Sequence, residues 1–118
     1  MKAYKKAIQI DSDLVDAYLG KGDALYFLER YREALAAFEQ AIELNPNSAL
    51  AYSGKGNSLY SLRRYEEALA AFEQAIGLNP NWPLAYFNKG STLEQLGKHQ
   101  EALAAEDKAR KLGYQVQK

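Results

Sequence analysis

The sequence predicts an all-α protein built as a solenoid, in which similar pairs of helices stack one after another. Two observations support this fold class. The sequence repeats itself with a period of about 34 residues, and the apolar residues of each repeat recur at spacings of three and four, as on one face of a helix. No stretch alternates apolar and polar residues with a period of two, so no strand is predicted. The 118 residues suit a single domain, residues 1–118.

The first predicted element, residues 2–10, resembles the second helix of a unit whose first helix is missing. Its apolar residues lie one period before those between Phe38 and Leu44. One side of this helix should pack on the first complete unit, and the other side should remain exposed. Exposed apolar surface favours association, so a homodimer is expected to be possible through four residues. These are Tyr4, Ala7, Ile8 and Ile10.

Three complete units follow, at residues 13–46, 47–80 and 81–114, and most positions are identical between the first two. In each unit two apolar stripes, separated by a short break, predict two antiparallel helices. The second helices should end at Asn45 and Asn79, because the proline that follows each lacks an N–H and disfavours helical backbone before it. Asn47 and Asn81 are then expected to be N-caps of the next helices.

The last helix is expected to close the solenoid as a C-terminal cap. Glu106 and Arg110 stand where the first unit has Phe38 and Ile42. They make the outward face of this helix polar, and terminal repeats need such a face to remain soluble.

These positions resemble the signature of the tetratricopeptide repeat, and the resemblance covers essentially the whole chain. In the first unit the signature residues are Tyr18, Gly22, Leu25, Ala34, Phe38, Ala41 and Pro46; in the second they are Tyr52, Gly56, Leu59, Ala68, Phe72, Ala75 and Pro80. The third unit keeps Tyr86, Gly90, Leu93, Ala102 and Ala109, but has Glu106 in place of Phe and Tyr114 in place of Pro. The resemblance implies a right-handed superhelix, with the first helices lining a concave groove. It also implies binding of peptides or proteins, without chemistry.

Composition argues against several other functions. The 15 basic and 15 acidic residues give a formal net charge of zero, without the basic excess that nucleic-acid binding needs. No cysteine is present, and His99 stands in the place of Tyr31 and Tyr65, so we interpret it as a packing residue rather than a metal ligand or base. No enzyme activity, metal or cofactor is expected. No apolar stretch is long enough for a membrane span or a signal peptide, so the cytoplasm is the expected location and no membrane partner is expected.

The implied concave groove is the candidate peptide-binding site. Its aromatic residues should anchor a partner, unless they pack against the neighbouring unit instead. Gly20 and Gly54, inside the same helices, either make room for a ligand backbone or allow tight packing. The candidate groove residues are Asp16, Leu19, Asp23, Tyr26 and Phe27 in the first unit, Leu50, Asn57 and Tyr60 in the second, and Leu84, Phe87, Asn88 and Ser91 in the third.

One subtype of the family does not fit this groove. Chaperone-binding members hold a terminal carboxylate with Lys, Asn and Arg side chains. The corresponding positions here carry no cation; they are Leu19, Asp23, Gly54, Leu84 and Asn88. We therefore expect a protein–protein interaction module with a different partner. The alternative is a structural spacer or oligomerisation segment of a larger multidomain protein.

Overall fold

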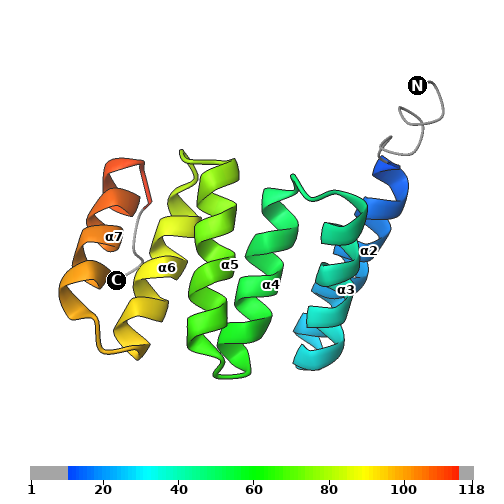
Figure 1. Cartoon of the computed structure of the whole chain (residues 1–118), viewed down its shortest axis with the longest axis horizontal. Coiled ribbons are helices and arrows are strands. Elements are labelled where there is room, and N and C mark those ends of the chain that lie inside the picture. Colours follow the sequence, from blue (N-terminus) through cyan, green and yellow to red (C-terminus); the bar gives the residue numbers. More distant parts are fainter. Residues whose placement is uncertain (1–10, 115–118) are drawn as a thin grey trace.

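The computed structural model describes residues 11–114, which form six helices and no strand. The helices succeed one another along the longest dimension of the molecule, 49 Å (Figure 1). The all-α repeat solenoid predicted from the sequence is confirmed, whereas the helix predicted at residues 2–10 lies outside the described residues. The six helices are α2 (Ser12–Phe27), α3 (Tyr31–Leu44), α4 (Ala49–Ser61), α5 (Tyr65–Leu78), α6 (Pro83–Gln95) and α7 (His99–Lys111).

The contacts between helices show which side of the stack is concave. Each helix packs against the next one along the chain, and the first helices of successive units also touch, α2 with α4 and α4 with α6. Within residues 11–114 no such contact joins α3 to α5 or α5 to α7. The first helices therefore lie closer together than the second helices, so α2, α4 and α6 form the concave side.

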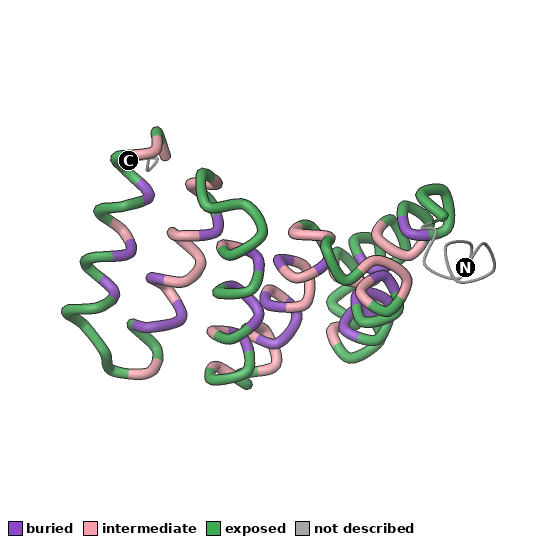
Figure 2. The backbone as a smooth tube through the Cα atoms, turned by 45° about the horizontal axis from the view of Figure 1, so that its top comes forward, coloured by how far each residue is buried: buried purple, intermediate pink, exposed green. Residues whose placement is uncertain are grey.

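Phe38 shows how two successive units are joined. Its side chain is 2% exposed. A Cβ added to Gly22, in the same unit, would lie 2.7 Å from the ring, and one added to Gly54, in the next unit, would overlap it. The ring thus occupies space on both sides of the boundary between units. In Figure 2 the buried segments accordingly face neighbouring helices.

The same tight turn joins the two helices of every unit. Its left-handed residue is Glu29 in the first unit (φ 61°), Arg63 in the second (φ 65°) and Gly97 in the third (φ 78°). In the first turn the N–H of Arg30 donates to the carbonyl oxygen of Leu25 at 2.9 Å, which satisfies an acceptor at the end of the helix. A turn this short requires the paired helices to run antiparallel.

The predicted N-caps are wrong. Ser48, not Asn47, caps α4, and its Oγ accepts from the N–H of Ala51 at 3.1 Å. The N–H of Asn47 instead donates to Oδ1 of Asn45 at 3.0 Å, which closes the turn around the proline. Helix α6 has no side-chain cap; Trp82 stands at the capping position and Pro83 begins the helix, where its missing N–H costs nothing.

The C-terminal end of the stack is partly polar. Glu106 is half-buried, and a Cβ at Gly90 would lie 2.9 Å from its Cγ, so its stem packs where a phenylalanine packs in the other units. Arg110 pairs with Asp107 at 2.6 Å, and Leu103 on the same helix is 58% exposed. The outer surface of α7 therefore carries both charged and apolar side chains.

Candidate functional site

The concave side contains a cavity of about 220 Å³ that opens between the first helices. Tyr26 belongs to α2, Asn57 and Tyr60 to α4, and Asn88 and Ser91 to α6. All five were predicted as groove residues, and the structure places them around one space. The ring of Phe72, from α5, also lines this cavity and was not predicted to do so.

Two tyrosines supply the aromatic wall, and each is held by its own unit. The ring of Tyr26 meets Tyr31 edge to face at 5.1 Å, and the ring of Tyr60 meets Tyr65 in the same way at 5.2 Å. The hydroxyl of Tyr26 also lies 3.1 Å from Oγ of Ser61, so it links α2 to α4. Both tyrosines are half-buried, so they pack within the stack and still line the cavity. Their fixed rings suit an anchoring role, because little side-chain entropy remains to be lost on binding.

Two asparagines from neighbouring units face each other across the cavity. Nδ2 of Asn88 donates to Oδ1 of Asn57 at 3.5 Å, which is long for a hydrogen bond. Each amide offers two N–H donors and an oxygen that can accept twice. One long contact therefore leaves most of this capacity free for a ligand. Peptide N–H and C=O groups carry the complementary set of donors and acceptors.

The remaining predicted groove residues lie outside this cavity. On the surface, Phe27 is 85% and Leu50 62% exposed, and Asp16, Asp23 and Leu84 are exposed as well. Leu19 is half-buried against the cluster of Val15, Ala41 and Ala51, so it contributes to packing. Phe87 stacks on Tyr114 at 4.5 Å between ring centroids, so the segment after α7 covers its ring.

The two glycines proposed to make room for a ligand differ. Space next to Gly54 is filled by Phe38, so this glycine serves packing. No atom lies within 4 Å of a Cβ added to Gly20, which leaves open space there.

His99 is not the packing residue that was predicted. Its ring is exposed, and Nδ1 lies 2.8 Å from Oε1 of Glu94. Glu94 and His99 occupy the positions of Tyr26 and Tyr31, so the third unit replaces an aromatic pair with a polar one. The groove thus becomes less aromatic towards its C-terminal end.

Among residues 11–114, no three His, Asp or Glu side chains come together in an arrangement that could bind a metal ion. None of the six helices has both the length and the apolar character that a membrane span requires.

Solved structures with the same arrangement of helices include several proteins of low sequence identity. The first TPR of Spaghetti (RPAP3) bound to the HSP90 peptide SRMEEVD gives a TM-score of 0.86 at 20% identity, with 88% of this chain and 82% of that chain covered. The type III secretion translocator chaperone SycD of Yersinia enterocolitica gives 0.84 at 20% identity, covering 86% and 77%. MamA gives 0.81 at 29% identity over 86% of this chain, which spans 60% of the MamA chain.

Sequence comparison identifies the family. No curated protein sequence matches the chain. The family model of the tetratricopeptide repeat matches twice, at residues 19–83 and 54–114, so the two matches together span residues 19–114 and include parts of all three units. The chain therefore belongs to the tetratricopeptide repeat family.

Proposed function

We propose that the chain is a protein–protein interaction module, which binds an extended peptide segment of a partner protein in its concave groove. The observation that carries this proposal is the cavity in which Tyr60, Asn57 and Asn88 converge from two neighbouring units. Aromatic side chains held in concave positions are common anchors of binding energy. The paired amides would hydrogen-bond the peptide backbone, and the exposed Asp16 and Asp23 would disfavour an acidic partner at the N-terminal end of the groove.

Comparison with the solved structures agrees with this proposal. The RPAP3 domain that shares the fold is bound to a peptide, and the SycD protein is described as a chaperone of translocators. Neither partner transfers to this chain at such low identity. We propose no catalysis and no cofactor for the groove, and we retain the cytoplasm as the expected location on the sequence alone.

Selection from a random peptide library displayed on phage tests the groove. Peptides recovered with the wild-type chain should bind Tyr60→Ala more weakly by about 1–2 kcal/mol, roughly a 5- to 30-fold increase in Kd. The matched control is Tyr52→Ala, because Tyr52 lies on the same helix but outside the groove cavity. Circular dichroism would check that both variants are folded. Peptides that bind Tyr60→Ala as tightly as wild type would contradict the groove proposal.

An alternative function is self-association, which the exposed face of α2 at the N-terminal end of the stack favours. Ala17 and Ala24 are exposed in α2, whereas their equivalents in α4, Ala51 and Ser58, are 0% exposed because the preceding unit covers them. We propose that the chain pairs with a second copy through Tyr4, Ala7, Ile8 and Ile10, which precede α2 in the sequence. Sedimentation at rising concentration should show a dimer that Ile8→Asp abolishes. A monomer at hundreds of micromolar would contradict this.

A further inference from the structure

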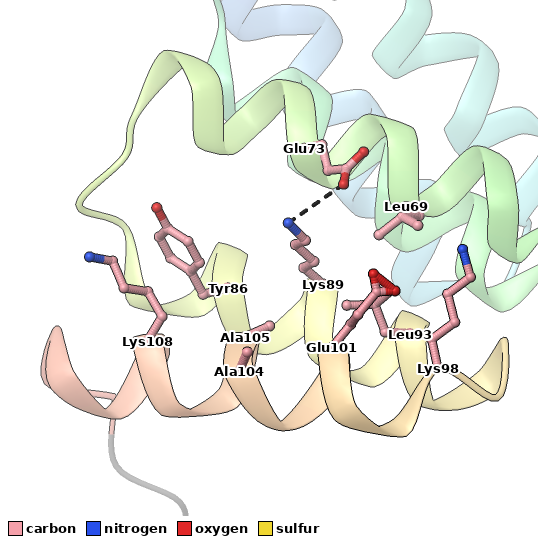
Figure 3. Close-up of a pocket in the computed structure, with 10 residues that line it drawn as sticks. All are labelled: Leu69, Glu73, Tyr86, Lys89, Leu93, Lys98, Glu101, Ala104, Ala105 and Lys108. Carbon is pink, nitrogen blue, oxygen red and sulfur yellow. Dashed lines mark ion pairs between the residues drawn. The ribbon is translucent and has the colours of Figure 1, made fainter.

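A second and larger cleft, of about 400 Å³, lies on the side of the stack opposite the groove. Its walls are α5 and α7, and α6 forms its floor (Figure 3). The second helices α5 and α7 do not touch each other. Lys89 and Leu93 face this cleft, whereas Asn88 and Ser91 face the groove, since successive residues of a helix are about 100° apart. The residues that line it are Leu69, Glu73, Tyr86, Lys89, Leu93, Lys98, Glu101, Ala104, Ala105 and Lys108.

The centre of this cleft is apolar. Leu93 is buried in the floor and Ala105 in the wall that α7 forms, and Leu69 reaches the centre from α5. Leu69 remains half-buried, whereas the equivalent Leu35, one unit earlier, is 8% exposed. The cleft between α5 and α7 therefore leaves open an apolar position that is closed between α3 and α5.

Several charges of the outer side are neutralised by ion pairs, either with the preceding unit or within the same unit. Lys55 pairs with Glu39 at 3.6 Å, and Lys89 pairs with Glu73 in the same way at 3.5 Å. Arg64 holds Glu67 at 2.7 Å, and this hydrogen bond lowers the pKa of the Glu67 carboxyl below its ordinary value. A partner would have to compete with these ion pairs to bind the same side chains.

Two lysines break this pattern in the third unit. Lys98 occupies the position that Arg64 has in the second unit. Lys108 occupies the position of Gln40 and Gln74 in the earlier units. Neither lysine forms an ion pair within residues 11–114; the Nζ atom of Lys108 lies 6.0 Å from the ring centroid of Tyr86. Figure 3 shows the two ammonium groups at opposite ends of the cleft; the apolar Leu93 and Ala105 lie between them, as do the Lys89–Glu73 ion pair and the carboxylate of Glu101.

We propose that this cleft is a second binding surface, which takes an acidic segment of a partner protein with an aliphatic side chain between two carboxylates. The Cα atoms of Lys98 and Lys108 are about 15 Å apart along α7, since each helical residue rises 1.5 Å. An extended peptide covers that span with carboxylates about five residues apart. Nucleic acid is a poorer fit, because a strand carries a phosphate at every nucleotide, and the phosphates between the two lysines would lie against Glu73 and Glu101.

The probe is the blocked hexapeptide acetyl-Glu-Ala-Leu-Leu-Ala-Glu-amide, titrated into the ¹⁵N-labelled full chain. We expect shifts of the amides of Leu69, Lys89 and Ala105, and a Kd that rises with salt. Lys98→Gln with Lys108→Gln should raise the Kd at least tenfold. Lys111→Gln, which removes a charge from the same helix outside the cleft, should leave it within twofold. Unchanged amide resonances of the residues in α4 would show that the double variant and the control variant remain folded.

Three results would overturn the proposal. One is the absence of shifts at the cleft with millimolar peptide, and another is equal binding by the double variant and the wild type. The third is the same set of shifts with inorganic phosphate, or with a peptide whose leucines are replaced by serine. The groove proposal does not depend on this outcome, because the groove amides lie on the other side of α6.

Discussion

At the scale of single residues, Gly20 and Gly54 occupy the same position in successive units but have different surroundings. A Cβ at Gly54 would overlap the buried ring of Phe38, whereas a Cβ at Gly20 would meet open space. Gly54→Ala should destabilise the chain by about 1–3 kcal/mol, because the core must shift. Gly20→Ala should stabilise it by roughly 0.5–1 kcal/mol, because alanine is the better helix former.

Urea unfolding of the two variants, followed by circular dichroism, measures both free energies. The two glycines serve as controls for each other, since the substitution and the helical position are the same. Equal changes in the two proteins would show that Phe38 does not fill the space at Gly54.

The capping residue of α4 can be tested in the same way. Ser48→Ala removes the oxygen that accepts from the N–H of Ala51, and it should cost about 1 kcal/mol of unfolding free energy. Asn47→Ala, the neighbouring control, should cost less, since Asn47 takes part in the turn through its backbone N–H. A larger loss in the Asn47 variant would mean that the sequence-based assignment of the cap was correct after all.

At the scale of the helices, the stripe along α2, α4 and α6 sets what the groove can bind. The positions that correspond to the cations of chaperone-binding family members hold Leu19, Leu84 and Asn88 here, and Asp23 is exposed. The peptide SRMEEVD, which the RPAP3 domain binds, carries a cluster of carboxylates. We expect the Kd of this peptide for the groove to exceed about 1 mM, which corresponds to a binding free energy weaker than about 4 kcal/mol. Titration into the ¹⁵N-labelled chain measures this at the groove amides, and groove shifts that saturate at micromolar peptide would contradict it.

The helices also show what can be predicted from the sequence. The period and the apolar stripes predicted the pairs, because burial at spacings of three and four is a local property of a helix. The cap of α4 was misassigned because Asn47 and Ser48 are adjacent and both can cap. The left-handed backbone at Glu29 and Arg63 could not be predicted, because neither residue type favours a positive φ. Only the third unit has a glycine, Gly97, at this turn position.

At the scale of the whole molecule, the two proposed binding surfaces follow from the curvature of the stack. Contacts among α2, α4 and α6 draw the first helices together, and the second helices separate on the other side. The sequence predicted that Tyr26, Asn57 and Asn88 share the concave face. It could not predict that Phe72 lines the same cavity or that Tyr114 covers Phe87, because both depend on how closely neighbouring units approach. The cleft of Lys98 and Lys108 was missed for the same reason.

The central claim is that the concave groove binds a peptide, and amide shift mapping tests it most directly. A peptide selected from the phage library would be titrated into the ¹⁵N-labelled chain. The account predicts that the largest shifts fall on Asn57, Tyr60, Asn88 and Ser91, which line the groove cavity. Shifts confined to the outer surfaces of α3, α5 and α7, with the groove amides unmoved, would contradict it.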